Sequence, residues 1–327
     1  CAPLPEAGVL LRQISEPPHP ELKLLAAEQI PQLQVALATR PHRTSLYTVA
    51  SLLGWMDLIQ LWWIELEGAF CLFAEQGGGL FMPVPPLRER FSASVAQSAW
   101  RILQETNRGA GVSRIEGIEL SERQEWIETG FALSGGEPEY LYQRSVLADL
   151  RGDAYRSQRW AANRCQQERQ LSFRPFESRD LSACLQLYTR WAIRRQQRDA
   201  EDRVSKRFAR DGLFFHRRLM MDAEALGVSG WVAEESGEIR GYTFGTPISK
   251  ELFCVMLEIA EPEIQGMASW LFRAYCQQLS AYELINTMGD SQLTGLRENK
   301  RAYRPLELIP METAVFAEEV VEKAAGG

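Results

Sequence analysis

The chain has 327 residues, of which 45% are hydrophobic and 24% are charged, a composition that excludes a disordered or fibrous protein. This length suits two domains better than one. The net charge of −7 argues against a protein that binds polyanions over its whole surface. Six scattered cysteines without a CxxC pair and three isolated histidines argue against a metal site.

The charge is distributed unevenly along the chain. Residues 140–218 hold 18 Lys and Arg against 9 Asp and Glu, a local net charge of +9, whereas the remainder holds 18 basic and 34 acidic residues. Such a basic segment can attract a polyanion even when the whole molecule is acidic. Acidic side chains from elsewhere in the fold could equally neutralise it, so both outcomes stay open at this point.

The first half of the chain predicts a proline-rich lead-in followed by strands and helices. The apolar run at 58–73 contains two glutamates, which favours a buried strand pair over a membrane span. The glycines at 77–79 lack a following Lys-Ser/Thr and lead into a strand, which favours a hairpin turn over a phosphate loop. The periodicity predicts strands at 60–66, 69–74, 80–84, 112–117 and 131–133, and a helix at 92–107.

An aromatic, strand-like segment at 139–144 and an arginine-rich helix precede the second half, which begins at 173–175. Its predicted elements are helices at 181–198 and up to about 226, strands at 228–233, 239–244 and 252–259, a helix at 264–279 and a strand at 284–287. The first half has the same order of three strands, a helix and a strand, which indicates a degenerate internal duplication. We divide the chain into a lead-in (1–20), an N-terminal domain (21–150), a basic linker helix (151–172), a C-terminal domain (173–314) and a tail (315–327).

The stretch at 286–305, NTMGDSQLTGLRENKRAYRP, has an unusual density of polar side chains. It follows a predicted strand, where the site residues of open α/β sheets gather. A capped helix with a solvated cationic edge produces the same pattern, so that alternative stays open. The candidate side chains for substrate binding and catalysis in this stretch are Asn286, Asp290, Arg297, Lys300, Tyr303 and Arg304.

The element order of the second half resembles the GNAT fold of acyl-CoA N-acyltransferases. That fold normally binds the pyrophosphate of an acyl carrier where the third strand meets a helix, because helix N-termini attract anions. The corresponding junction here is EPEIQGMA at 261–268, in which Gln265 and Gly266 match the usual loop. Glu261 and Glu263 would repel a phosphate, so standard acetyl-CoA binding is disfavoured.

Four segments together resemble the DUF2156 family, which is related to the C-terminal, cytosolic part of phosphatidylglycerol lysyltransferase. The resemblance covers residues 32–314 and implies an α/β (α+β) fold with two tandem GNAT-like domains, mixed sheets flanked by helices, and a basic helix joining them. It also implies a cytoplasmic location. The segments that carry it are TSLYTVASLLGW (44–55), residues 140–164, Leu257-Glu258 and residues 286–305.

The resemblance implies an enzyme of the aminoacyltransferase class. Its lysyltransferase relatives take an aminoacyl group from charged tRNA and pass it to a lipid head group, so we expect an aminoacyl-tRNA donor, a lipid or small-molecule acceptor, and no cofactor. A GNAT-type enzyme with an acyl-CoA or other thioester donor is the alternative, and a non-catalytic RNA- or lipid-binding relative is a third. A lipid acceptor would imply a peripheral membrane contact, although no amphipathic anchor is evident. The resemblance does not indicate the oligomeric state.

The resemblance also implies roles for individual residues. We expect Lys300 and Arg297 to place positive charge near the developing oxyanion or the tRNA 3′ end. Asp290 or Glu258, the acid that closes the third strand, would orient the α-amine of the donor or accept the proton of the acceptor. For each residue a surface ion pair is the alternative. The residues expected to track RNA phosphates from the basic helix are Arg156, Arg159, Asn163 and Arg164.

Overall fold

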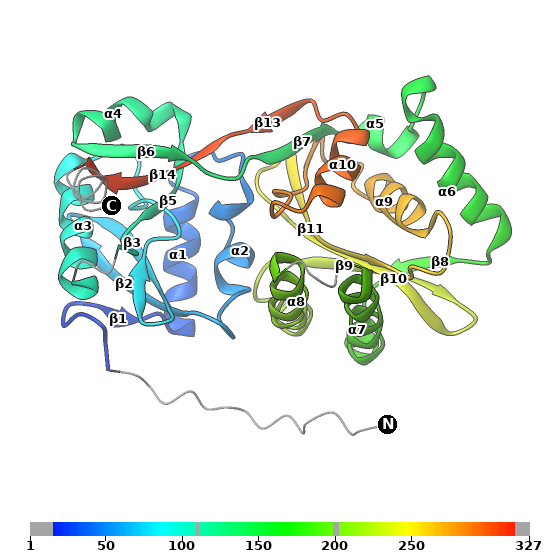
Figure 1. Ribbon diagram of the computed structural model, residues 1–327, viewed down its shortest axis with the longest axis horizontal. Coiled ribbons are helices and arrows are strands. Elements are labelled where there is room, and N and C mark those ends of the chain that lie inside the picture. The colour runs from blue at the N-terminus through cyan, green and yellow to red at the C-terminus, as the bar shows by residue number, and fades with distance from the viewer. Residues whose placement is uncertain (1–15, 109–110, 199–202, 318–327) are drawn as a thin grey trace.

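The computed structural model describes residues 16–108, 111–198 and 203–317 (Figure 1). Most of the expected lead-in and of the expected tail lies outside these ranges. The helices are α1 (Ile30–Leu37), α2 (Val49–Leu53), α3 (Ala93–Asn107), α4 (Arg123–Glu128), α5 (Arg144–Asp149), α6 (Arg156–Glu168), α7 (Leu181–Arg198), α8 (Arg203–Met221), α9 (Met267–Gln278) and α10 (Thr294–Ala302). The strands are β1 (Lys23–Leu24), β2 (Gln60–Leu66), β3 (Ala69–Gln76), β4 (Gly79–Phe81), β5 (Ile115–Glu119), β6 (Phe131–Gly135), β7 (Glu139–Gln143), β8 (Ser172–Pro175), β9 (Ser229–Glu235), β10 (Glu238–Pro247), β11 (Leu252–Ala260), β12 (Leu284–Asn286), β13 (Glu307–Ile309) and β14 (Met311–Phe316).

The C-terminal half is built on a seven-stranded sheet with the order β13-β7-β12-β11-β10-β9-β8. All neighbouring strands are antiparallel except β11 and β12, which are parallel and are connected through α9. Figure 1 shows α9 and α10 on one side of this sheet and α7 and α8 on the other. This arrangement confirms the mixed α/β class and places the whole of β12 beside the first three residues of β11.

The N-terminal half contains two smaller sheets, β1-β2-β3-β4 and β5-β14-β6. A parallel bridge between Met82, which follows β4, and Ile115 of β5 links them. The chain passes through α3 between β4 and β5, as it passes through α9 between β11 and β12. Strands β2 and β3 pair along their whole length, which confirms the buried strand pair predicted at 58–73.

Two strands lie in the sheet of the opposite half. β7, which falls within the expected N-terminal domain, is hydrogen-bonded between β12 and β13. β14 follows β13 along the chain and lies between β5 and β6. Figure 1 shows the two connections, β6 to β7 and β13 to β14, running side by side between the halves. The expected boundaries at residues 150 and 314 therefore do not coincide with the division of the strands into sheets.

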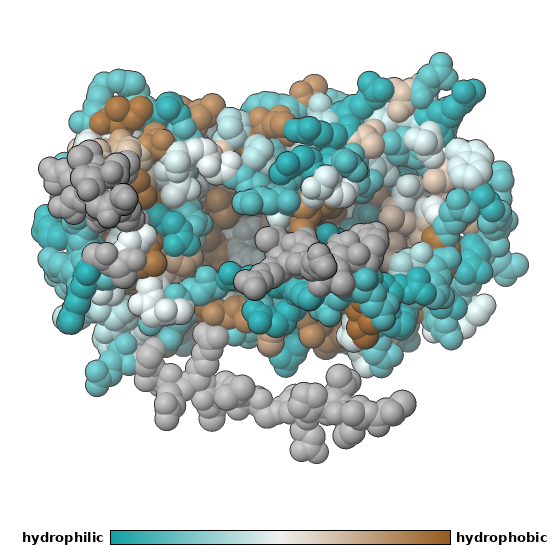
Figure 2. Space-filling model, viewed as in Figure 1, coloured by the Kyte–Doolittle hydropathy of each residue, from teal (hydrophilic) through white to brown (hydrophobic). Residues whose placement is uncertain are grey.

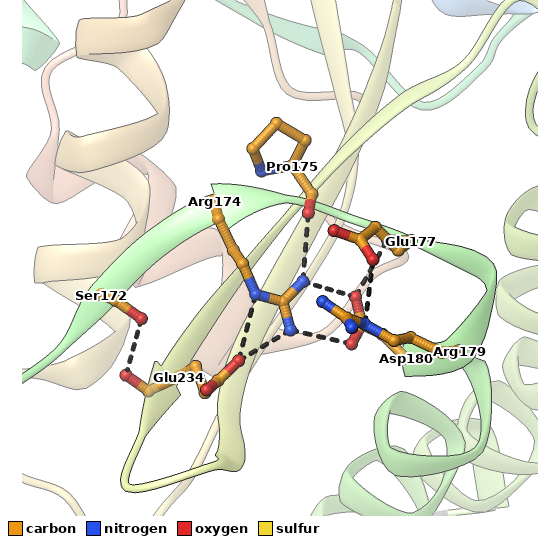
Figure 3. A network of polar contacts seen from close by, with 7 residues as sticks. All are labelled: Ser172, Arg174, Pro175, Glu177, Arg179, Asp180 and Glu234. Atoms are coloured by element: carbon orange, nitrogen blue, oxygen red, sulfur yellow. Dashed lines mark hydrogen bonds and ion pairs between the residues drawn. The ribbon is translucent and has the colours of Figure 1, made fainter.

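Ion pairs neutralise part of the basic segment at 140–218. Arg174 of β8 donates to Glu234 at 2.7 and 3.0 Å and to Asp180 at 2.7 and 2.9 Å, which ties the edge of the sheet to the start of α7 (Figure 3). The Arg174 guanidinium holds the pKa of Asp180 below its usual range. Glu234 lies outside this segment, so an acidic side chain from elsewhere in the fold balances one of its arginines, one of the two outcomes left open by the sequence.

The described helices include none that is long and apolar enough to cross a membrane. Five cysteines, Cys71, Cys165, Cys184, Cys254 and Cys276, are free and buried, as their apolar surroundings in the sequence predict. Figure 2 shows a face on which hydrophilic residues predominate and hydrophobic residues form scattered patches.

Candidate functional site

The loop that follows β12 has a strained backbone. Met288, Ser291 and Gln292 have φ angles of 62°, 52° and 58°, in the left-handed region that non-glycine residues rarely adopt. Each such conformation costs on the order of 1–3 kcal/mol and persists only where the surrounding structure imposes it, which happens most often at functional sites. The strained loop at 287–293 is therefore a candidate functional segment.

Lys300 of α10 holds this loop in place. Its ammonium group donates to the carbonyl oxygens of Thr287, of Met288 at 3.1 Å and of Gly289 at 2.5 Å, and lies 5.4 Å from the centre of the Tyr140 ring. An ammonium group has three donors, so all of them are engaged by the loop. Burial lowers the pKa of Lys300 to about 8, although nearby thiol and carboxyl groups act in the opposite direction. Lys300 can therefore influence a substrate in two ways, through its positive charge and by fixing the shape of the loop.

Asp290 lies inside the same loop and is buried. Its carboxylate accepts hydrogen bonds from the Tyr140 hydroxyl at 2.7 Å, from Arg297 at 2.8 and 3.1 Å, and from the backbone N–H of Gln292 at 3.0 Å. The Arg297 guanidinium is the main reason that the pKa of Asp290 is lowered to about 2. A carboxylate with that pKa is a weak base at neutral pH. These contacts tie Asp290 to the loop and to Arg297.

Asn286 connects the loop to the N-terminal half. Its buried amide donates to Glu139 at 2.6 Å and to the backbone oxygen of Arg43 at 3.0 Å, and its side-chain oxygen accepts from the N–H of Met288 at 2.7 Å. Glu139 in turn accepts hydrogen bonds from the backbone N–H and the hydroxyl of Ser45. Burial raises the pKa of Glu139. The amide of Asn286 is therefore engaged within the protein, where it supports the loop.

Glu258 lies on the part of β11 that extends beyond its pairing with β12. Their last pair is Cys254 with Asn286, and from there to Ala260 no described strand lies beside β11 on the β12 side. Glu258 is paired across the sheet with Thr243 of β10, so the two side chains share one face. Neither Oε2 of Glu258 nor the hydroxyl of Thr243 has a hydrogen-bond partner among the described residues, although both atoms are shielded from solvent.

These unpaired polar atoms are the strongest indication of a ligand site. Buried polar groups in proteins are almost always hydrogen-bonded, so each exception calls for an explanation. Burial raises the pKa of Glu258 to about 8, while the charge of Lys300 acts in the opposite direction. Burial likewise raises the pKa of the nearby Tyr303 hydroxyl to about 12. A carboxyl group with a pKa near 8 can exchange a proton close to neutral pH, as a general base must.

The predicted residues of the basic helix lie apart from this group and are mostly engaged. Arg159 donates to two backbone carbonyls that follow α5, one of them at 2.8 Å. Asn163 accepts from Arg273 of α9 at 2.8 Å, and Arg164 pairs at 2.7 Å with the last residue of α6. Arg156 is exposed, and in the described parts of the chain it forms no ion pair. Of the four, Arg156 is thus the one best placed to meet a phosphate.

The β11–α9 junction, where a GNAT enzyme would bind pyrophosphate, is covered by α6. A Cβ atom on Gly266 would lie 2.2 Å from the carbonyl oxygen of Ala161, so the two helices approach as closely as a glycine allows. Glu261 and Glu263, which were expected to repel phosphate, pair with arginines of α7. The junction therefore lacks an open anion site.

Most of the predicted site residues converge, with one correction. The spacing of Arg297, Lys300 and Arg304 predicts one helical face for all three, but α10 ends at Ala302, and Arg304, with a φ of 53°, lies outside the helix. Residues that sequence reasoning missed are Ser45, Thr243, Glu139 and Tyr140. The sequence signal that could have identified Glu139 was a glutamate at the start of an otherwise aromatic strand at 139–143. The residues that the structure brings together are Glu258, Asn286, Asp290, Arg297, Lys300 and Tyr303.

Comparison with known proteins identifies the family. A family model described as phosphatidylglycerol lysyltransferase, C-terminal, matches residues 37–312. The chain belongs to the phosphatidylglycerol lysyltransferase C-terminal family. This confirms the resemblance seen in the sequence and makes the protein an enzyme of the acyltransferase class. A search of curated protein sequences found no match to the chain.

Several solved structures share the fold of this family member. A conserved protein of unknown function from Bacteroides thetaiotaomicron superposes with a TM-score of 0.77 at 20% identity, covering 90% of this chain and 99% of that one. L-PGS from Bacillus licheniformis gives a TM-score of 0.62 at 16% identity, covering 96% of this chain and 98% of that one. FemX gives 0.59 at 8% identity, covering 93% and 99%. At these identities the likeness establishes the fold.

Proposed function

We propose that the protein transfers an aminoacyl group from an aminoacyl-tRNA to a lipid head group or a small-molecule acceptor. Membership of the phosphatidylglycerol lysyltransferase family supports aminoacyl transfer as the class of reaction. The observation that carries the proposal is the Glu258 carboxyl, whose pKa burial raises to about 8 and which has an unpaired oxygen on the part of β11 that extends beyond β12. The buried cation of Lys300 lies close enough to influence that carboxyl.

The proposed reaction needs no covalent intermediate, because an aminoacyl ester is already activated. The amine or hydroxyl of the acceptor attacks the ester carbonyl carbon, and Glu258 takes the proton from the attacking atom. The positive charge of Lys300 stabilises the oxyanion of the tetrahedral intermediate. The bond between that carbon and the ribose oxygen then breaks, and Glu258 returns the proton to the ribose oxygen. The products are the aminoacylated acceptor and a tRNA with a free terminal hydroxyl.

We also infer that the two halves are tandem GNAT-like units, of which the C-terminal one carries the chemistry. Both contain a pair of parallel strand segments with a helix between them in the chain. In the N-terminal half this junction is filled by Met82 and Ile115, which are fully buried apolar residues. In the C-terminal half the corresponding junction holds Glu258.

The alternative donor, an acyl-CoA or another thioester, receives less support. The covering of the β11–α9 junction by α6 removes the anion site that such a donor would use in the C-terminal half. A non-catalytic relative that binds RNA or lipid would have no use for a buried carboxyl with a raised pKa, which destabilises the folded protein.

Transfer of a radiolabelled aminoacyl group from a mixture of charged tRNAs to a bacterial lipid and metabolite extract tests the proposal. We expect label to appear in an acceptor with the wild type, and to appear about 10²- to 10⁴-fold more slowly with Glu258→Gln, the usual effect of removing a general base. Glu251→Gln, an exposed glutamate directly before β11, is the matched control and should transfer normally. Transfer from acyl-CoA but not from tRNA would show that the donor is a thioester. Binding of tRNA without any transfer would favour the non-catalytic alternative.

A further inference from the structure

Thr243 of β10 has a buried hydroxyl group that the proposed chemistry does not use. Its exposed fraction is 0%, and its Oγ1 has no hydrogen-bond partner among the residues that the structure describes. Valine has nearly the same shape as threonine and would fill this place without burying an unpaired polar atom. A fully buried threonine with an unpaired hydroxyl therefore calls for a reason other than packing.

The side chain of Thr243 points to the α9 side of the sheet. Tyr242, the residue before it, faces α8 on the other side, where its hydroxyl lies 2.8 Å from Nδ1 of His216 (Figure 1). Successive side chains of a strand point to opposite faces, so Thr243 faces α9. Gly241, two residues earlier, confirms this direction, because a Cβ atom on it would lie 2.9 and 3.1 Å from side-chain carbons of α9.

Glu258 faces the same side, directly across from Thr243. The two residues are partners in the pairing of β10 with β11. Burial, together with the charge of Glu258, raises the pKa of the Cys276 thiol in α9 and of the Tyr303 hydroxyl next to α10, which places the carboxyl on the side of these helices. Such partners have Cβ atoms about 4.5–5.5 Å apart. Rotation of the Thr243 and Glu258 side chains is therefore enough to bring the two unpaired oxygens within hydrogen-bond distance.

The other groups around Glu258 do not supply this hydrogen bond. Among the described residues, the titratable groups that face the carboxyl are Lys300, Cys276 and Tyr303. Burial raises the pKa of the thiol and of the phenol, so both are neutral at pH 7. The charge of Lys300 favours the ionised carboxyl, but its three N–H donors are directed to carbonyl oxygens of the strained loop. An ionised Glu258 therefore needs another donor, and the Thr243 hydroxyl is placed to be one.

We propose that Thr243 is a positioning residue for the general base, whose hydroxyl donates a hydrogen bond to Oε2 of Glu258 when the carboxyl is ionised. This inference rests on the proposed function. A hydrogen bond to a carboxylate is stronger than one to a neutral carboxyl, so the hydroxyl favours the form of Glu258 that takes a proton from the acceptor. The same bond holds the carboxyl in one orientation.

The test is the pH dependence of kcat/KM for aminoacyl transfer, measured from pH 6 to 9 with wild type, Thr243→Val and Thr243→Ser. The acid limb of this profile reports the pKa of the base in the free enzyme. Loss of a hydrogen bond to a charged group should move the limb of Thr243→Val upward by about 1–2 pH units. Transfer should then be about 10- to 100-fold slower than in the wild type at pH 7, and about 2- to 10-fold slower at pH 9. Thr243→Ser keeps a hydroxyl and should follow the wild type.

Thr246→Val is the matched control. Thr246 is another buried threonine of β10, but its hydroxyl donates to the backbone oxygen of Gly227 at 2.8 Å. Its replacement should lower the melting temperature and leave the acid limb in place. Thr243→Val removes an unpaired hydroxyl and should not lower the melting temperature. If Thr243→Val does not fold, Thr243→Ala removes the same hydroxyl and should give the same shift of the limb.

A second measurement does not depend on transfer. Glu258→Gln is introduced into the wild type and into Thr243→Val, and the free energy of unfolding in urea is compared from pH 5 to 9. The destabilising effect of the carboxyl grows with pH up to its folded pKa. The stabilisation by glutamine should therefore increase more steeply above pH 8 in the Thr243→Val background than in the wild type.

An acid limb at the same pH in Thr243→Val and wild type would overturn the inference, and so would an equal shift in Thr243→Ser. If the wild type transfers normally and the two backgrounds respond alike above pH 8, only this inference fails. If the wild type transfers no aminoacyl group, the proposed function fails, and the unfolding comparison still decides whether Thr243 acts on Glu258.

Discussion

Replacing Glu258 with glutamine should change stability and activity in opposite directions. Burial raises the pKa of this carboxyl from 4.5 to about 8. At pH 7 the carboxyl is therefore ionised in the unfolded chain and mostly protonated in the folded protein, so folding takes up a proton. Because the folded pKa lies above the unfolded one, the carboxyl destabilises the fold progressively as the pH rises from 4.5 to 8, and has no such effect below 4.5.

The magnitude follows from the width of that pH window. The interval from 4.5 to pH 7 is about 2.5 units, and each unit corresponds to about 1.4 kcal/mol, so ionisable Glu258 costs on the order of 3 kcal/mol at pH 7. Glutamine has nearly the same shape and cannot ionise, which removes this cost. Its amide would be buried without a partner and offset about 1–2 kcal/mol of the gain. We expect a net stabilisation of about 1–2 kcal/mol at pH 7, more at pH 8, and none at pH 5.

Urea unfolding of wild type and Glu258→Gln at pH 5, 6, 7 and 8 measures this difference, and aminoacyl transfer at pH 7 measures the loss of activity. The free energy of unfolding of the variant should increase relative to wild type at each step, while Glu251→Gln tracks the wild type throughout. A difference that stays constant with pH would show that the carboxyl has an ordinary pKa. In that case the argument for Glu258 as the general base is refuted.

Three further variants test the supporting contacts. Lys300→Met removes three hydrogen bonds to the loop, each worth about 0.5–1.5 kcal/mol, and should lower the unfolding midpoint in urea and abolish transfer; normal transfer would remove Lys300 from the site. Asp290→Asn should reduce kcat by about 10²-fold through misplacement of the loop. The stability that Asp290→Asn loses should become smaller as the pH falls from 3.8 toward 2, because the depressed pKa of Asp290 stabilises the fold fully only above that window. A loss in the free energy of unfolding, measured in urea, that is the same at pH 7 and pH 3 would contradict this. Arg174→Met breaks the pairs with Asp180 and Glu234 and should cost about 1–3 kcal/mol of stability without affecting transfer, whereas a proportional loss of transfer would tie this network to the site.

Much of the secondary structure was predictable because strong apolar periodicity is a local property. The helix predicted at 181–198 is α7, with the same bounds, and the strand predicted at 60–66 is β2. β13 and β14 were not predicted. Both are short, and they pair with β5, β6 and β7, which lie more than 150 residues earlier in the chain, so no local pattern marks them. The division of the strands between the halves could not be predicted for the same reason.

The candidate site was predictable where one segment carries it. Asp290, Arg297 and Lys300 lie within one short motif, and the structure joins them through the strained loop. Glu139 and Ser45 reach the site through contacts between segments 94 residues apart, which a single sequence does not reveal. The assignment of roles also required coordinates: only the contacts show that Asp290 is fully engaged while an oxygen of Glu258 is unpaired.

The crossing of β7 and β14 between the sheets has a consequence for how the chain folds during synthesis. β5 and β6 leave a space that only β14, among the last described residues to be made, can fill. β7 is translated early, yet its partners β12 and β13 follow more than 140 residues later. Neither half can complete its hydrogen bonding while the ribosome is still translating the other, so the usual order, with an N-terminal domain folding first, does not apply. The two halves should reach the native state together, in one late step.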